Sequence, residues 1–282
     1  MTEQILGGPL AERMVESLKA RVTSLKDHGI DPHLFLVQVG SDEATETYVR
    51  AKVKRGNKIG IKVSHQKFDV GITYEKLIEE INSISLDEEV SGVMVENPLP
   101  KHLDFFKVVE NIPFYKDVDG MTATNQGMIA LRNEFLVPAT AAAVVELISD
   151  VKPPQGSSVA IINRSPIVGK PLAMMLINRD FTVTVCHSKT PDIRKITKAS
   201  DIIVPAVGKL NFLDRSYVSE NSIIVDVGIN AVENGIKGDA NYEELNGFVR
   251  AITPVPGGVG PLTATLIMEN TVRAAEYKRS HR

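Results

Sequence analysis

The sequence predicts an α/β protein composed of two α/β domains. In both halves of the 282-residue chain, short apolar runs typical of buried strands alternate with stretches of helical periodicity. This alternation is the pattern of parallel sheets covered by helices. The length agrees, because it suffices for two modest domains that each have a hydrophobic core.

The N-terminal half is expected to contain three helices and three strands. Leu10, Met14, Leu18, Val22 and Leu25 recur every three or four residues and mark an amphipathic helix. Two further helices are expected over residues 43–58 and 73–84, and strands over residues 34–39, 61–68 and 92–95. Residues 98–125 are dense in Pro, Asp and Gly, which predicts loops around one short helix.

The C-terminal half predicts a doubly wound nucleotide-binding unit. A helix over residues 138–150 precedes four apolar strands. The first strand begins near Ser158, and the other three lie in residues 182–188, 201–208 and 222–228. Helices between such strands form a parallel sheet that binds nucleotides at its carboxyl edge. A last helix is expected over residues 261–278, after the loop TPVPGGVG.

Composition argues against a protein that binds nucleic acid, spans a membrane, is secreted or holds a metal. The net charge of −3 gives no general attraction to nucleic acid or to an anionic membrane. No apolar run approaches the roughly 18 residues of a membrane span, and the acidic N-terminus does not resemble a signal peptide. The single cysteine excludes an intrachain disulfide and fits a reducing compartment, so we expect a cytoplasmic protein. The six histidines lack metal-ligand spacing, so no metal is expected.

The segment AIINRSPIVGKP (160–171) runs from a strand through a turn into a helix. This is the context of a dinucleotide fingerprint, in which phosphates rest on a helix N-terminus. The glycine pattern is poor, because Asn163, Ser165 and Val168 occupy its three positions and Gly169 falls one place late. Asn tolerates positive φ, so Asn163 could still form the tight turn. A purely structural turn remains the alternative.

Two further positions favour NADP over NAD. Arg164 lies in the turn, and the next strand ends at Ser188 and Lys189 without an acidic residue. A carboxylate at that strand end commonly binds the ribose of NAD, whereas a 2′-phosphate requires cationic and hydroxyl donors. Lys189 could equally be a solvated surface charge.

TETYVRAKVK (45–54) places Tyr48 and Lys52 four residues apart, on one face of a helix. Short-chain dehydrogenases use such a pair, but downstream of their nucleotide-binding turn. Here the pair precedes the only plausible turn, so that family is excluded by domain order. Val49, Val53 and Gly56 form the opposing stripe, which suits packing against a sheet.

Seven stretches together resemble the bifunctional methylenetetrahydrofolate dehydrogenase/methenyltetrahydrofolate cyclohydrolase family. They are VGSDEATETYVRAKVKRGNKIGI (39–61), VENPLPKHL (95–103), KDVDGMT (116–122), INRSPIVGKPLA (162–173), CHSKT (186–190), VDVGIN (225–230) and TPVPGGVGPLT (253–263). They extend over nearly the whole chain in the order found in the family.

The resemblance implies a fold, a cofactor and an assembly. Residues 1–137 would form a three-layer folate-binding catalytic domain, completed by the returning C-terminal helix 261–282. Residues 138–260 would form a Rossmann-like domain that binds NADP. The substrates would be one-carbon derivatives of tetrahydrofolate, and the protein would be a homodimer.

The resemblance also assigns site residues. Tyr48 would stack on the substrate, Lys52 would be the catalytic lysine, and Asp119 would bind the amino-pyrimidine edge of the pterin, with Asp117 in a structural or capping role. Backbone at Pro256, Gly257 and Gly258 would approach the flat substrate. Asn163, Arg164, Ser165, Ser188 and Ile229 would bind the cofactor, Ile229 on the nicotinamide side.

The implied chemistry has two steps. Hydride passes from the one-carbon unit to NADP, which requires positioning rather than a strong base. Water then adds to the methenyl cation and the ring opens to formyltetrahydrofolate, which requires proton transfer.

The chain departs from the family at Glu96, where glutamine is usual beside the catalytic lysine; Asn97 replaces the leucine that follows. A carboxylate within about 4–6 Å favours the ammonium form of Lys52, and a lysine fixed as a cation is a poorer base. We therefore hypothesise that hydrolysis is weakened or reassigned to Glu96.

Two milder departures concern the second domain. Asn163 replaces a glycine of the nucleotide turn, which would loosen phosphate contact, and PATA (138–141) keeps only Pro138 and Thr140 of a longer family block. Thr140 remains a candidate cap for the following helix. Two other functions stay open: a dehydrogenase without cyclohydrolase activity, and a non-catalytic nucleotide sensor, against which the retention of Tyr48 and Lys52 argues.

Overall fold

The structure is a computed structural model that describes residues 2–233 and 235–281. Its contacts divide the chain into two compact units. Unit 1 contains Met1–Ala11 and Thr140–Thr263, and unit 2 contains Glu12–Ala139 and Ala264–Arg282. Helices α1 (Gly7–Asp27) and α10 (Gly260–Ser280) each contribute residues to both units.

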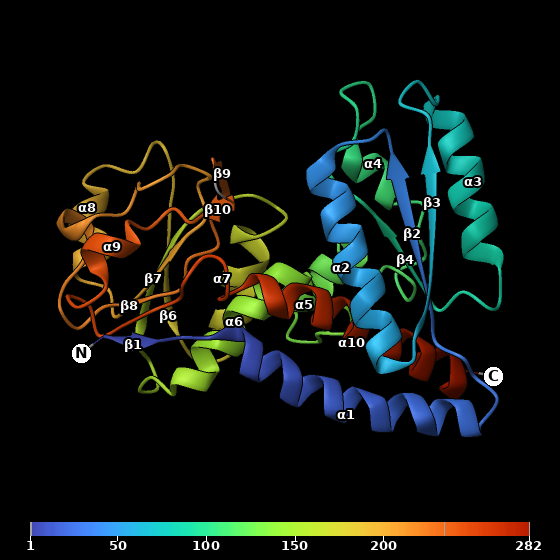
Figure 1. Cartoon of the computed structure of the whole chain (residues 1–282), viewed down its shortest axis with the longest axis horizontal. Helices are drawn as coiled ribbons and strands as arrows, with labels where there is room; N and C mark the ends of the chain where they lie inside the picture. The colour runs from blue at the N-terminus through green and yellow to red at the C-terminus, as the bar shows by residue number, and fades with distance from the viewer. Residues whose placement is uncertain (1, 234, 282) are drawn as a thin grey trace. The chain divides into compact units, whose positions relative to one another are not determined.

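Unit 2 is built on a three-stranded parallel sheet. The strands lie in the order β3 (Lys62–Phe68), β2 (His33–Val39), β4 (Gly92–Val95). Figure 1 shows these strands between α2 (Glu43–Ile59) and α3 (Tyr74–Leu86). Two short helices follow β4, α4 (Phe105–Val109) and α5 (Ala123–Ala130). The expected three-layer arrangement is confirmed.

The C-terminal helix returns to unit 2, as predicted. Its Asn270 is buried and donates two hydrogen bonds of 2.8 Å, to the carbonyl oxygens of Val118 and Val137. Near its end, Glu276 forms an ion pair of 2.7 Å with Arg21 of α1. These bonds join segments of unit 2 that are far apart in sequence.

Unit 1 contains a six-stranded sheet in the order β1-β11-β8-β7-β5-β6, with every neighbouring pair parallel. The strands are β1 (Glu3–Gln4), β5 (Ser158–Ile162), β6 (Thr182–Cys186), β7 (Ile202–Pro205), β8 (Ile223–Ile224) and β11 (Ala251–Ile252). The helices of this unit, apart from the parts of α1 and α10, are α6 (Ala139–Val151), α7 (Gly169–Ile177), α8 (Ile193–Lys198), α9 (Tyr242–Leu245) and the 3₁₀ turn Arg215–Tyr217. An antiparallel hairpin, β9 (Asn230–Val232) and β10 (Gly235–Lys237), follows β8. The doubly wound prediction is confirmed.

The strand order creates a topological switch point. From β5 the chain crosses to β6 on one side, and it then returns to β7 on the other side of β5. In open α/β sheets, ligands bind outside the carboxyl ends of the strands at such a point. The relevant position in unit 1 is therefore the crevice after Ile162 and Pro205.

Two expectations for strands and one for helices were inaccurate. The strand predicted over residues 222–228 is only two residues long, because the backbone beyond it turns around the buried Asp226. β1 and β11 were not predicted, and their pairing joins the start of the chain to unit 1. Residues 98–125 contain α4 and also the start of α5, rather than one short helix.

Within residues 2–233 and 235–281, no helix is both long enough and apolar enough to cross a membrane.

Candidate functional site

Lys52 and Glu96 form a buried ion pair in unit 2. The Nζ atom of Lys52 donates to both carboxylate oxygens of Glu96, at 2.8 and 2.7 Å. Lys52 lies on α2, and Glu96 directly follows β4, where its N–H donates to the carbonyl of Val37 at 2.8 Å. The expected proximity of the two side chains is observed. Their catalytic roles stay predictions.

Helix α2 is held so that one face carries polar groups and the other packs on the sheet. Asp42 caps its start by accepting from the N–H of Thr45 at 3.0 Å, and Gly60 ends it with φ 91°. A Cβ at Gly56 would lie 2.4 Å from Cγ2 of Val63, so this face contacts β3 closely. Tyr48 is 43% exposed, and partial burial raises its pKa. It is therefore a neutral phenol near pH 7.

Asp119 lies half-buried in a group of like charges. Its pKa is raised to about 8, chiefly by burial; the charges of Asp117 and, to a smaller degree, Glu96 act in the same direction, while that of Lys52 lowers it. Asp119 is consequently protonated near pH 7. Binding of the pterin edge by Asp119 stays a prediction, and acceptance by both of its carboxyl oxygens would require the loss of this proton.

Asp117 has the structural role that was expected. It is 1% exposed, and its Oδ2 accepts from the N–H of Thr122 at 2.8 Å and from Nδ2 of Asn125 at 2.9 Å. These bonds fix the turn that contains Asp119 and leads into α5.

Two polar residues near this site were missed in the sequence. Gln38 on β2 is 2% exposed; its Oε1 lies 2.9 Å from Nε2 of His65 on β3, and its Nε2 donates to the carbonyl of Gly40 at 3.1 Å. Burial lowers the pKa of His65, against the opposing charge of Glu96. The available signal was a glutamine within the apolar strand LFLVQV.

In unit 1, the side chain of Asn163 organises the turn between β5 and α7. Its Nδ2 donates to the carbonyl of Ala206 at 2.6 Å, and its Oδ1 accepts from the N–H groups of Ser165 at 2.7 Å and Gly169 at 3.1 Å. Asn163 does not adopt positive φ. The expected mechanism of the tight turn was therefore wrong, because side-chain hydrogen bonds form it instead of a left-handed backbone.

The same turn uses its own backbone donors. Besides the two N–H groups bound by Asn163, that of Val168 donates to Oγ of Ser165 at 3.1 Å and that of Lys170 to the carbonyl of Ser165 at 3.0 Å. A phosphate resting on these four N–H groups, as a standard fingerprint predicts, would have to displace internal bonds. Donors in side chains therefore become more important.

Three such side chains lie at one edge of the sheet. β5 and β6 are parallel and their last residues, Ile162 and Cys186, are paired, so Arg164, Ser188 and Lys189 follow the carboxyl ends of adjacent strands. All three are exposed. Cationic and hydroxyl donors in this position fit a 2′-phosphate, and CHSKT contains no acid that would repel one.

The remaining predicted residues follow β8 and β11 in unit 1. Ile229 is 49% exposed. In the loop 256–258, Gly257 has φ 118° and Gly258 donates to the carbonyl of Pro254 at 2.8 Å, so the expected tight turn is present. This loop belongs to unit 1, whereas Tyr48, Lys52 and Asp119 belong to unit 2. Contact of the loop with a substrate stays a prediction.

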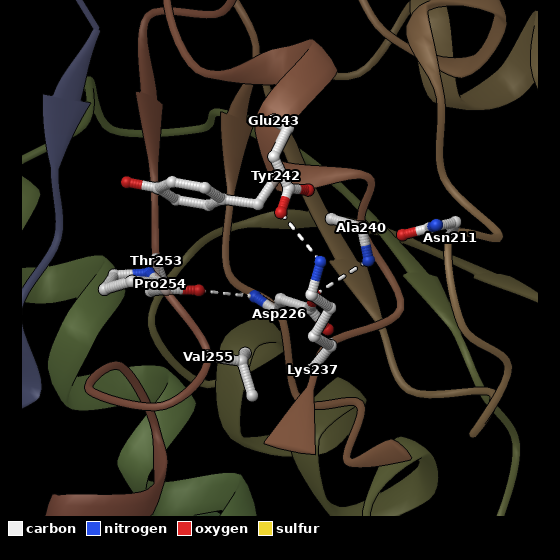
Figure 2. A pocket seen from close by; sticks show the side chains of 10 residues that line it. Asn211, Asp226, Lys237, Ala240, Tyr242, Glu243, Thr253, Pro254 and Val255 are labelled. Atoms are coloured by element: carbon white, nitrogen blue, oxygen red, sulfur yellow. Dashed lines mark hydrogen bonds and ion pairs between the residues drawn. The ribbon is translucent and has the colours of Figure 1, made fainter. Parts of the chain in front are cut away.

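Two buried acids beside this edge were also missed. Asp226, 2% exposed, accepts from the N–H of Gly228 and of Ala240, both at 2.8 Å, and burial raises its pKa to about 6. Figure 2 shows it in a cavity of about 160 Å³, near the ion pair between Lys237 and Glu243. Asp239 is fully buried. The sequence signal was an acid that interrupts the apolar run SIIVDVG.

Comparison with known protein families identifies both halves of the chain. Residues 5–119 match the catalytic domain of tetrahydrofolate dehydrogenase/cyclohydrolase, and residues 138–279 match its NAD(P)-binding domain. The bifunctional protein FolD of Thermoplasma volcanium is 51% identical over 272 residues, covering 96% of this chain and 95% of that protein. FolD of Acetivibrio thermocellus is 42% identical over 284 residues and 99% of each chain.

Solved structures agree. A bifunctional 5,10-methylenetetrahydrofolate dehydrogenase/cyclohydrolase from Thermoplasma acidophilum superimposes with a TM-score of 0.94 at 48% identity, covering 99% of this chain and 100% of that one. FolD of Trypanosoma brucei, solved with NADP and an inhibitor, gives 0.93 at 33% identity, covering 100% and 99%. The chain thus belongs to the tetrahydrofolate dehydrogenase/cyclohydrolase family.

Proposed function

We propose that this chain oxidises methylenetetrahydrofolate to methenyltetrahydrofolate with NADP and then hydrolyses the product to formyltetrahydrofolate. The observation that carries this function is that both domains of the bifunctional family match, over residues 5–119 and 138–279. Nothing in the comparisons favours a dehydrogenase that lacks the second activity. A sensor without catalysis would have no use for the buried pair of Lys52 and Glu96.

The ion pair suggests how the hydrolytic step is divided between two residues. Lys52 already donates to both oxygens of Glu96, so it is poorly placed to accept a proton. We assign the base to Glu96: as water adds to the one-carbon unit, its carboxylate accepts a proton from the water. Lys52 then orients this carboxylate and offsets the charge of the group. Glu96 then returns this proton to the departing ring nitrogen as the carbon–nitrogen bond breaks, and the hydroxyl loses its proton to water as the formyl carbonyl forms, so that one proton is released overall.

Substrate binding in unit 2 would involve Tyr48 and Asp119. The exposed ring of Tyr48 offers a surface for stacking, and Asp119 would accept from the donor-rich pterin edge after it loses its proton. We propose that Pro256, Gly257 and Gly258 provide backbone contacts to the substrate. The folate domain would then comprise residues 1–137 with helix 261–282, and the NADP domain residues 138–260.

Unit 1 fits NADP through its own residues. When bound, NADP supplies the acceptor for the hydride of the first step. Arg164 and Ser165 would hold phosphate oxygens, and Ser188, helped by Lys189, would bind the 2′-phosphate. Asn163 would act by fixing the turn at the switch point, and Ile229 would lie against the nicotinamide side. The exposed donors and the absence of an acid from CHSKT support this choice.

We further propose a homodimer in the cytoplasm. β6 is an edge strand, and Val185 on it and Met174 and Ile177 on the adjacent α7 are 37%, 41% and 49% exposed. Apolar side chains beside an unpaired strand edge suit association with a second copy. The single cysteine, Cys186, is free and buried, which fits a reducing compartment.

The function is tested by following methylenetetrahydrofolate with NADP in one cuvette. NADPH and the methenyl product should form together, and the methenyl absorbance should then decay. If NADPH forms and methenyltetrahydrofolate persists at the rate of its uncatalysed hydrolysis, the second activity is absent. If neither product forms, the whole proposal fails.

The role of Glu96 is tested by Glu96→Gln. The substitution removes the proposed base and also frees Lys52 from its ion pair, which leaves the lysine beside the glutamine that is usual in the family. We expect the ratio of hydrolysis to hydride transfer to change by about 10-fold or more, while hydride transfer itself changes by less than about threefold because it needs no base. Glu79→Gln serves as control, because Glu79 also pairs with a lysine, Lys76, but on the surface of α3. An unchanged ratio of the two activities in Glu96→Gln would remove Glu96 from the mechanism.

A further inference from the structure

One buried carboxylate joins the loops that follow β7 and β8. Asp239 is fully buried, and its Oδ2 accepts from the N–H groups of Val207 at 2.6 Å and Gly208 at 3.0 Å. Its Oδ1 accepts from the N–H of Lys209 at 2.7 Å and from Nδ2 of Asn230 at 3.0 Å. Three consecutive backbone donors of one loop and the side chain of Asn230, which follows the other loop, therefore meet on a single carboxyl group.

Asp239 is itself held firmly. Its N–H donates to Oδ1 of Asp226 at 3.1 Å, and its carbonyl accepts from the N–H of Leu213 at 2.9 Å. The second loop also touches it, because a Cβ at Gly228 would lie 2.2 Å from Cγ of Asp239. The carboxylate thus lies between the two loops, and a shift of either loop alone would break its hydrogen bonds or its close contact with Gly228.

These loops begin at the switch point of the sheet. Loop 207–209 follows Ala206, whose carbonyl accepts from Nδ2 of Asn163 at 2.6 Å, so it starts beside the end of β5. Each loop exposes an apolar side chain, Val207 at 40% and Ile229 at 49%. Exposed apolar groups at the rim of a nucleotide crevice suit contact with a flat ring.

We propose that Asp239 is a positioning residue of the NADP site, which fixes loops 207–209 and 228–230 in the arrangement that the cofactor requires. It does not touch the ligand. The proposal rests on the proposed function, because it takes NADP to bind at the carboxyl edge of unit 1. Its physical basis is preorganisation: loops already held in place lose less conformational freedom when a ligand binds.

The test substitution is Asp239→Asn, which keeps the shape. Each carboxyl oxygen accepts from two donors, so in either orientation the NH₂ group of the amide would face two of the four donors and break the arrangement. We expect the Kd and KM for NADP to rise about 10-fold or more, since displacements near 1 Å can cost up to about 100-fold in rate. The KM and kcat for hydrolysis of methenyltetrahydrofolate should stay within about twofold. Binding is measured by calorimetric titration with NADP, so the result does not depend on turnover.

Asp201→Asn is the matched control. Asp201 accepts from the N–H and the hydroxyl of Ser158, at 2.8 and 2.7 Å, before β7 rather than after it. Asp201 lies at the amino ends of β5 and β7, opposite to the carboxyl ends where NADP is proposed to bind. Its substitution should therefore alter stability without weakening the affinity for NADP. Asn230→Ala removes one donor to Asp239 and should raise the Kd for NADP by about two- to fivefold. This variant provides the test if Asp239→Asn does not fold.

The outcomes separate two failures. If the unaltered protein binds NADP and both variants bind it equally well, Asp239 has no positioning role although the proposed function stands. Equal losses of NADP affinity and of hydrolysis would show a general structural role, which also overturns the inference. If the unaltered protein binds no NADP, the proposed function fails and the inference fails with it.

Discussion

The buried acids of this chain differ in what surrounds each carboxyl group. Asp226 and Asp239 lie against several backbone N–H groups, which stabilise a carboxylate in the interior. Asp119 instead lies among other acids, with Lys52 as the opposing charge. The first arrangement organises loops. In the second, burial is opposed less: the pKa of Asp226 is raised to about 6 and that of Asp119 to about 8, so Asp119 keeps a proton that can be released when a ligand with suitable donors arrives.

Asp119→Asn should therefore stabilise the protein, increasingly so as the pH rises. The pKa of Asp119 is raised from 3.8 to about 8, so between these values the unfolded chain releases a proton that the folded chain retains. Stability contributed by this group thus falls with rising pH across that window, and asparagine removes the loss. We expect the thermal midpoint of the variant to exceed that of the parent at pH 8 by roughly 2–4 °C for each kcal/mol regained, and to match it near pH 4.

Thermal unfolding at pH 4, 6 and 8 measures this difference. A variant that is destabilised equally at every pH would contradict the raised pKa, and would show that Asp119 makes stabilising contacts as a carboxylate. Activity is expected to fall in either case, because asparagine has one acceptor atom where a carboxylate has two, and its NH₂ group would face a donor.

Single residues were predictable where a pattern carries their role. Tyr48 and Lys52 share a helix face by spacing, and the family resemblance implies that position 96 lies beside the catalytic lysine, so the pair of Lys52 and Glu96 could be anticipated. The contacts of Asp239 with Val207 and of Asn163 with Ala206 could not be predicted, because each joins residues more than 30 positions apart in sequence. No periodicity marks such partners.

Among the secondary-structure elements, long ones were predicted well and short ones were not. β2 and α2 have enough residues for a pattern to show, and they begin and end within a few residues of the expected positions. β1, β8 and β11 each have two residues, which cannot display a period. Pairing with neighbouring strands forms them, so only the assembled sheet reveals them.

The edge strand β6 carries the prediction about assembly. Val185→Lys should shift the protein from dimer toward monomer, because a charge beside an unpaired strand edge opposes contact with a second apolar surface. Light scattering coupled to gel filtration measures the mass. Leu131→Lys is the control, because Leu131 is 80% exposed and belongs to unit 2, which does not contain this strand. Dissociation by both variants, or by neither, would contradict an interface at β6.

On the scale of the whole molecule, neither unit is a continuous piece of chain. Unit 1 takes its first residues from the N-terminus, and unit 2 takes its last helix from the C-terminus. The sequence predicted the return of the C-terminal helix through a family resemblance. It did not predict that residues 1–11 belong to unit 1, because this depends on a strand of two residues and on a close backbone contact with the loop 256–258.

The contact between Gly7 and the loop 256–258 leaves no room for a side chain at position 7. The N–H of Gly7 donates to the carbonyl of Gly257 at 2.9 Å, and a Cβ at Gly7 would lie 1.9 Å from the carbonyl oxygen of Gly258. Gly7→Ala must therefore displace the start of α1 from the loop, at a cost of about 1–3 kcal/mol in the free energy of unfolding. Because the loop is proposed to contact the substrate, the KM for methylenetetrahydrofolate should also rise.

The neighbouring glycine supplies the control for this substitution. A Cβ at Gly8 would meet nothing within 4 Å, so Gly8→Ala should leave stability unchanged or raise it slightly, as alanine is the better helix former. Thermal unfolding and steady-state kinetics on both variants decide the matter. Equal stability of Gly7→Ala and Gly8→Ala would mean that the start of the chain does not close unit 1. A loss of stability in Gly7→Ala without any change in KM would separate this closing contact from substrate binding.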